Sequence, residues 1–202
     1  MGNEVFCRVR LGGQESEGRA LLETSEILFR GDFRLKIPFS AVQSAKAVDG
    51  ELCLKTAQGA AILQLGSQAG RWLEKILHPK SRIEKLGVKS DAKVSLIGKF
   101  DAEFLREILA LTKSVSKGKA PAHSEHIFFA ANSKSDFSSL AKLTKSLFGA
   151  AALWIVYPKG QKRISERDVL FAGRKSGLKD VKVVGFSPTH TALKFVVPLS
   201  RR

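Results

Sequence analysis

The sequence predicts a two-domain α+β protein, with an N-terminal antiparallel β-barrel that ends in a helix and a C-terminal three-layer α/β domain that ends in an antiparallel hairpin. Three observations predict this fold class. The first half of the 202 residues consists of short apolar or alternating runs separated by turn residues, and the second half alternates unbroken apolar runs with helical ones. A proline stop and a glycine-containing linker separate the halves, so we place the domains at residues 1–89 and 90–202.

Composition favours a folded protein of a reducing compartment. The chain is 44% apolar and 26% charged, and no run of about 18 apolar residues is present for a membrane span. Residues 1–6 lack the basic start and apolar stretch of a signal peptide. The two cysteines, Cys7 and Cys53, lie in apolar runs far from any second Cys or His. We therefore expect a cytoplasmic protein without a Cys-based metal site.

Seven short runs in the first half are predicted to be strands. They cover residues 4–10, 18–23, 26–30, 33–39, 42–48, 51–56 and 60–65. Asp49-Gly50 between two of them is a strong signal for a two-residue hairpin, because the tight turn needs positive φ at both positions. Ser67 then caps a helix that Pro79 ends, and the apolar face of this helix places Trp72 in the core.

The first half resembles bacterial pleckstrin-homology or GRAM-like domains over roughly residues 3–78. The stretches that carry this resemblance are residues 19–24, 27–30, 37–39 and 49–52, together with the helical Trp72. The resemblance implies a barrel used for contacts with proteins or lipids. Many such domains bind phosphoinositides through basic residues of the first hairpin, whereas residues 12–17 read Gly-Gly-Gln-Glu-Ser-Glu. This acidic hairpin argues against a phosphoinositide role.

Strands and helices alternate in the second half. Predicted strands at residues 94–97, 127–131 and 151–157 are followed by predicted helices at 101–111, 136–147 and 165–176. Residues 181–186 and 191–197 then form a hairpin through the turn 187–190. Unbroken apolar strands such as the one ending at Tyr157 are typical of a sheet that helices cover on both faces. A mainly parallel sheet is the expected result.

This order of elements, with Gly177-Leu178 leading into the final hairpin, resembles the C-terminal part of a Rossmann-like methyltransferase fold. Such enzymes bind S-adenosylmethionine (SAM) at a glycine-rich turn after the first strand. Here that turn carries the single glycine Gly98 and the bulky Phe100, and the second strand closes on Ala130-Ala131-Asn132 without an acidic residue. We therefore expect no SAM site and no other cofactor.

Two stretches, residues 153–160 and 187–196, resemble a bacterial family whose function is unassigned. The likeness covers roughly residues 90–199 and implies no activity.

Lysine-bearing loops follow all three predicted parallel strands and should meet at one edge of the sheet. Helix N-termini at this edge add N–H donors and a positive dipole, so a phosphate or carboxylate could bind there. The alternative is ordinary solvated loops in a lysine-rich chain. A phosphate-binding P-loop is excluded, because the loop at Lys159 lacks the required glycine spacing. The candidate anion-binding residues are Lys99, Ser133, Lys134, Lys159, Lys162, Arg163 and His190.

Three further patterns give only weak evidence of a functional site. Ser165 and Asp168 form a near capping box, which accounts for both residues. His190 lies in the last hairpin without a paired carboxylate, Ser or Cys, so a general-base role has only its position in its favour. His123 and His126 are three residues apart without a third nearby ligand, which is a weak metal signal, and no metal is expected.

The function predicted from these features is a non-enzymatic binding or scaffold protein, with a basic crevice for a small anion and a barrel for a protein partner. No catalytic residue is assigned. One alternative is an enzyme acting on a phosphorylated or carboxylated small molecule. Another is non-specific binding of nucleic acid, because residues 91–202 carry 20 basic and 9 acidic residues, against 14 and 10 in residues 1–90.

Overall fold

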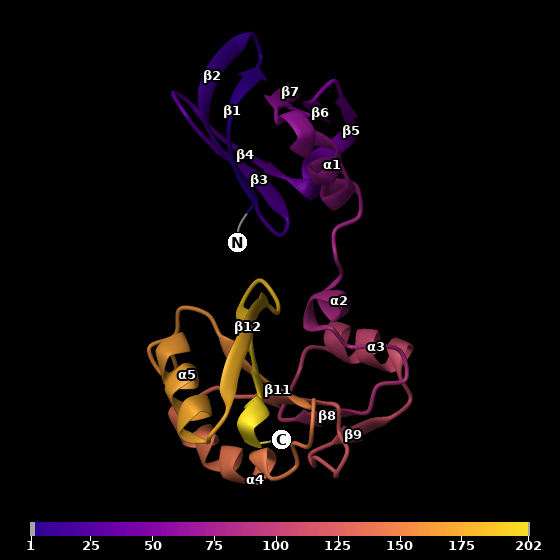
Figure 1. Cartoon of the computed structure of the whole chain (residues 1–202), viewed down its shortest axis with the longest axis vertical. Coiled ribbons are helices and arrows are strands. Elements are labelled where there is room, and N and C mark those ends of the chain that lie inside the picture. The colour runs from indigo at the N-terminus through magenta and orange to yellow at the C-terminus, as the bar shows by residue number, and fades with distance from the viewer. Residues whose placement is uncertain (1–2, 202) are drawn as a thin grey trace. The chain divides into compact units, whose positions relative to one another are not determined.

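The computed structural model describes residues 3–201 and divides the chain into two compact units, Met1–Lys80 and Ser81–Arg202 (Figure 1). The division falls between Lys80 and Ser81, whereas the sequence placed it near residue 89. The reason is that Ile83, Leu86 and Val88 are buried in the core of the second unit. The stretch interpreted as a linker is thus part of the α/β unit.

The first unit is a curled, seven-stranded antiparallel sheet followed by a helix. The strand order is β4-β3-β2-β1-β7-β6-β5. The strands are β1 (Asn3–Leu11), β2 (Gln14–Leu22), β3 (Glu26–Arg30), β4 (Arg34–Pro38), β5 (Val42–Val48), β6 (Glu51–Thr56) and β7 (Gly59–Gln64). Short 3-10 turns, η1 (Phe39–Ala41) and η2 (Gly66–Gln68), precede β5 and helix α1 (Ala69–Leu77).

Turn chemistry and alternation explain this meander. Asp49 and Gly50 both have positive φ, 49° and 79°, in the tight turn between β5 and β6, which confirms the predicted hairpin. Inward-facing residues of the strands form one core with the inner face of α1. Trp72 is fully buried there, so its predicted role as a core anchor is confirmed.

The second unit contains a six-stranded sheet of order β12-β13-β11-β10-β8-β9. The parallel strands are β8 (Val94–Ile97), β9 (Val115–Lys117), β10 (His126–Ala130) and β11 (Ala152–Pro158), and the hairpin strands are β12 (Lys179–Gly185) and β13 (His190–Val196). β13 pairs antiparallel with both β11 and β12. This mainly parallel sheet gives the unit its Rossmann-like character, although the sequence did not predict β9.

The helices of the second unit are α2 (Arg82–Leu86), α3 (Ala102–Leu111), α4 (Leu140–Thr144) and α5 (Glu166–Lys175). The helix predicted at 136–147 is instead the 3-10 turn η3 (Lys134–Ser139) followed by the short α4, and η4 (Leu199–Arg201) is a further 3-10 turn. At the start of α5, Ser165 and Asp168 form the predicted capping box. Of the helices described within residues 3–201, none is long and apolar enough to cross a membrane.

Side chains of β10 and β11 alternate between two cores, one on each face of the sheet. Phe128 and Trp154 lie in the core that α3 covers through Phe104. Ile127 and Leu153 lie in the core that α4 and α5 cover, as do the inner residues of those helices. The sheet is therefore buried on both faces, which accounts for its unbroken apolar strands. Trp154 is fully buried, as predicted.

Candidate functional site

The turn after β8 defines the edge of the sheet where the parallel strands end. Gly98 has a φ of +97°, in the region that favours glycine. A Cβ at this position would lie 3.0 Å from the Cβ of Ala130 and 3.2 Å from its carbonyl oxygen. The missing side chain thus lets the turn after β8 pass close to the end of β10.

A cavity of about 360 Å³ lies at this edge, and we call it the strand-end cavity. Its walls come from the turn after β8, from the ends of β10 and β11, and from the β12–β13 hairpin. The residues that line it are Arg82, Lys99, Phe100, Asp101, Glu103, Ala130, Asn132, Val156, Phe186, Ser187, Pro188, Thr189 and His190. This is the position at which open α/β sheets bind ligands.

Arg82, on the first turn of α2, neutralises the carboxylates on one side of the strand-end cavity. Its guanidinium lies 3.1 Å from Asp101, 2.8 Å from Glu107 and 3.7 Å from Glu103. The same group stacks over the rings of Phe104 and Phe186, and its side chain is only 10% exposed. Arg82 is thus committed to these contacts within the protein.

Asp101 connects this network to helix α3. Its Oδ1 accepts a hydrogen bond of 2.7 Å from the backbone N–H of Phe104, which caps the helix. Burial opposes ionisation of Asp101, but this N–H and the Arg82 guanidinium outweigh it, so the pKa of the carboxyl lies below its ordinary value. Asp101 is therefore a carboxylate that occupies the α3 N-terminus, where a ligand anion would otherwise be favoured.

His190 and the turn before it form another part of the wall. Nδ1 of His190 lies 2.9 Å from Oγ1 of Thr189, and the backbone N–H of His190 donates to Oγ of Ser187 at 3.0 Å. Lys159 holds the same turn, because its Nζ donates to the carbonyl oxygens of Ser187 at 2.8 Å and Pro188 at 3.4 Å. The imidazole is thus fixed through Nδ1, which leaves Nε2 as its second polar atom.

The seven residues that the sequence proposed for anion binding lie in different surroundings. Lys99 and His190 both line the strand-end cavity. Lys134 instead makes an ion pair of 2.9 Å with Asp168, and Ser133 takes part in the cap of η3. Lys159 donates hydrogen bonds to the hairpin turn. Lys162 and Arg163 are exposed in the loop before α5. The structure thus brings Lys99 and His190 to one cavity and commits Lys134 and Lys159 to internal partners.

Three residues of the strand-end cavity were missed in the sequence. Arg82 lay in the stretch interpreted as a linker, and nothing local signals its partners. Asn132 lies two residues after the end of β10, and its position in a strand-end loop was a usable signal. Asp101 is the first residue of the helix predicted at 101–111 and could have been recognised as its N-cap.

The histidines His123 and His126 lie in different surroundings. His126 is buried on β10, whereas the ring of His123 lies 6.0 Å from that of the exposed Phe148. Within residues 3–201, no three His, Cys, Asp or Glu side chains are grouped so that they could hold a metal ion.

Part of the chain is similar in fold to solved methyltransferase structures. A putative type 11 methyltransferase from Sulfolobus solfataricus is 15% identical, with a TM-score of 0.43, over 55% of this chain and 87% of its own. A SAM-dependent methyltransferase from Aquifex aeolicus is 17% identical, with a TM-score of 0.42, over 56% and 86%. A TehB-like SAM-dependent methyltransferase from Corynebacterium glutamicum is 12% identical, with a TM-score of 0.40, over 64% and 96%. No family model and no curated protein matches the chain.

These comparisons contradict the prediction of a non-enzymatic binding or scaffold protein. The similar structures are titled as methyltransferases, which are enzymes. At 9–17% identity and with TM-scores below 0.5, the likeness concerns the arrangement of strands and helices and assigns no substrate. The reaction has to be argued from the residues of this chain.

Proposed function

We propose that the second unit is the catalytic unit of an enzyme, and that this enzyme acts on a small phosphorylated or carboxylated molecule bound in the strand-end cavity. One observation carries the proposal: Lys99 and His190 line the same cavity, and Lys99 has no hydrogen bond or ion pair within the part of the chain that the structure describes. The cavity thus combines a free cation with an imidazole at the edge where such sheets bind ligands.

Lys99 would bind the anionic group of the substrate. Arg82 lies nearby, but three carboxylates share its charge. Asp101 already occupies the positive end of α3. Asn132 adds an amide to the lining of the same cavity. The available positive charge is therefore that of Lys99.

His190 would exchange a proton or a hydrogen bond with the substrate. Its contact with Thr189 holds the ring in one orientation, which leaves Nε2 for the substrate. Where the Thr189 hydroxyl donates to Nδ1, Nε2 carries the hydrogen and donates a hydrogen bond to the substrate. Where Nδ1 donates to Thr189, Nε2 accepts a proton as a base. Ser187, Thr189 and Lys159 act as positioning residues through the turn that they stabilise.

SAM has no step in this proposal, because the residues of the cavity do not fit it. The space beside Gly98 is taken by Ala130 and is not open to a ligand. The ring of Phe100 lies 5.4 Å from that of Phe104 and 6.2 Å from that of Phe186, so it fills the floor below the turn. The two carboxylates that line the cavity, Asp101 and Glu103, both form ion pairs with Arg82.

For the first unit we propose the pleckstrin-homology-like or GRAM-like fold that its sequence resembles. Seven antiparallel strands followed by one helix support this assignment. The division of the chain into this domain and a Rossmann-like domain, and a cytoplasmic location, are parts of the same proposal.

The test uses inorganic phosphate as the probe. The melting temperature of the full chain is measured in phosphate and in chloride at matched ionic strength. A ligand that binds only the native state at ten times its Kd adds about 1.4 kcal/mol of stability, which corresponds to roughly 3–6 °C. Lys99→Gln should remove this phosphate-specific shift, and the exposed Lys113→Gln serves as the matched control. General stabilisation by excluded salt is the same in both variants and cancels in the comparison.

Catalysis is tested separately. Phosphorylated and carboxylated metabolites that raise the melting temperature are followed for turnover by NMR. His190→Gln should keep binding and lose turnover. Equal phosphate shifts in the wild type and in Lys99→Gln, or full turnover in His190→Gln, would overturn the proposal.

A further inference from the structure

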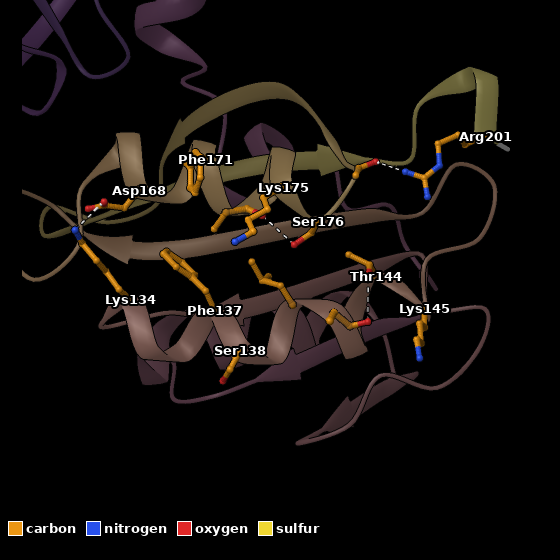
Figure 2. Close-up of a pocket in the computed structure, with 14 residues that line it drawn as sticks. Lys134, Phe137, Ser138, Thr144, Lys145, Asp168, Phe171, Lys175, Ser176 and Arg201 are labelled. Atoms are coloured by element: carbon orange, nitrogen blue, oxygen red, sulfur yellow. Dashed lines mark hydrogen bonds and ion pairs between the residues drawn. The ribbon is translucent and has the colours of Figure 1, made fainter.

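A second and larger cavity lies away from the strand-end cavity, between η3–α4 and α5. We call it the helix groove, and its volume is about 850 Å³ (Figure 2). This volume lies within the range of about 300–1,000 Å³ found for small-molecule sites. The residues that line it are Lys134, Phe137, Ser138, Leu140, Ala141, Thr144, Lys145, Asp168, Phe171, Ala172, Lys175, Ser176, Gly177 and Arg201.

The walls of the helix groove are largely apolar. Phe137 comes from the η3 side and Phe171 from α5, so the two rings belong to opposite walls (Figure 2). Phe171 is 67% exposed although it is large and aromatic. Packing of α5 on the sheet does not need it, because Val169 and Gly173 form the buried face of that helix. The groove therefore presents an aromatic surface that the core leaves unused.

Charge is distributed unevenly along the groove. At one end, Asp168 and Lys134 neutralise each other at 2.9 Å, and this contact and the Ser165 hydroxyl lower the pKa of Asp168 to about 2. Lys145 and Arg201 lie toward the other end, with Lys175 between the walls (Figure 2). The ammonium groups of Lys145 and Lys175 have no hydrogen bond or ion pair among residues 3–201, and the guanidinium of Arg201 there has one hydrogen bond, to the carbonyl of Gly177. One end is thus neutral, the other end carries Lys145 and Arg201 without a carboxylate, and Lys175 adds a third positive charge between the two ends.

We propose that the helix groove binds a free amphiphilic anion, namely a molecule with an apolar chain or ring and one carboxylate head. The apolar part would lie between Phe137 and Phe171, and the head would lie among Lys145, Lys175 and Arg201. A membrane surface fits less well, because the apolar residues line a hollow rather than a protruding face. An acidic helix fits less well, because only three cations of the groove lack a carboxylate partner among the described residues. This inference is independent of the function proposed for the strand-end cavity.

The test titrates decanoate, below its micelle concentration, into the ¹⁵N-labelled full chain. Saturable shifts are expected for amides of η3, α4 and α5. Decanol supplies the chain without the charge and acetate supplies the charge without the chain, so both should bind at least about tenfold more weakly if each part of the site contributes roughly 1.4 kcal/mol.

Paired variants separate specific binding from general attraction. Lys145→Gln with Lys175→Gln should weaken decanoate binding at least fivefold, and Phe171→Ser should do the same through the apolar part. The matched controls are Lys142→Gln, on α4 but outside the lining, and Leu109→Ser, an exposed residue of α3. Both controls should bind as the wild type does.

Several outcomes would overturn the inference. These are the absence of saturable shifts, equal binding of decanol and decanoate, or controls that weaken binding as much as the groove variants do. Binding of anionic vesicles or of an acidic amphipathic peptide to these amides, with none by decanoate, would assign the groove to another partner and also overturn it.

Discussion

His126 should make the second unit lose stability in mild acid. The imidazole lies at the start of β10, stacked on Phe128 with ring centroids 6.3 Å apart, and only 9% of the residue is exposed. Nδ1 is buried without a hydrogen-bond partner among the described residues. Burial first, and then the charge of Lys194, lower the pKa of His126 from 6.5 to about 4, against a smaller opposing effect of Glu125.

The direction of the effect follows from proton binding. Between the two pKa values the unfolded chain binds a proton that the native protein does not, so the free energy of unfolding falls as the pH falls through this range. From pH 7 to pH 5 the loss is about 2 kcal/mol, and it levels off at about 3 kcal/mol below pH 4. Asp168, with its pKa lowered to about 2, titrates below this range.

Urea titrations at pH 7 and pH 5 measure the loss. Trp154 fluorescence in a Trp72→Phe background reports the second unit alone, because the two tryptophans lie in different units. His126→Leu keeps an apolar group at this site and cannot be protonated, so its stability should change by less than about 0.5 kcal/mol between the two pH values. A wild-type loss that persists undiminished in His126→Leu would refute the assignment.

Three further predictions concern packing and charge. Trp154→Ala should cost about 3–5 kcal/mol, because the ring is fully buried beside Phe128; a loss below about 1 kcal/mol in a denaturation followed by circular dichroism would contradict its placement. Gly173→Ala should cost about 1–3 kcal/mol, since the new Cβ would overlap the Phe195 ring. In the control Gly70→Ala, in helix α1, the new Cβ meets nothing within 4 Å, so the first unit should become more stable by about 0.5–1 kcal/mol, as measured by Trp72 fluorescence. Equal effects of the two glycine changes would contradict the packing of α5. Arg82→Met keeps most of the side-chain volume but leaves Asp101 and Glu107 without their cation. The free energy of unfolding, measured by Trp154 fluorescence in urea, should therefore fall by about 2 kcal/mol. An unchanged urea midpoint would show that solvent satisfies these carboxylates.

Local signals explain which parts of the fold were predictable. The Asp49-Gly50 turn, the capping box at Ser165 and the unbroken apolar strand of Trp154 each depend on neighbouring residues in the sequence. β9 was missed, because it has only three residues and none of them is buried. The helix predicted from residue 136 was too long, because its first part is a 3-10 turn.

The candidate site was less predictable, because its contacts are long-range. Arg82 reaches the carbonyl of Phe186, 104 residues away in the chain, and stacks on the Phe186 ring. No periodicity in a segment of residues reveals such a pair. The sequence did place the loops of Lys99, Lys134 and Lys159 at strand ends. It did not indicate that Asp168 and the carbonyl of Ser187 would bind two of these lysines.

The two cavities of the second unit differ in their charge balance, and this decides how anion binding has to be measured. In the strand-end cavity, Arg82 and Lys99 face Asp101 and Glu103, so the formal charges cancel. In the helix groove, four cationic side chains face one carboxylate. Anion uptake by the whole chain therefore reports mainly the groove, and only the difference between the wild type and Lys99→Gln reports the strand-end cavity. Phosphate lacks an apolar part, whereas decanoate has one that Phe137 and Phe171 would bind. An anion whose strong binding is unchanged by Lys99→Gln would therefore be assigned to the helix groove.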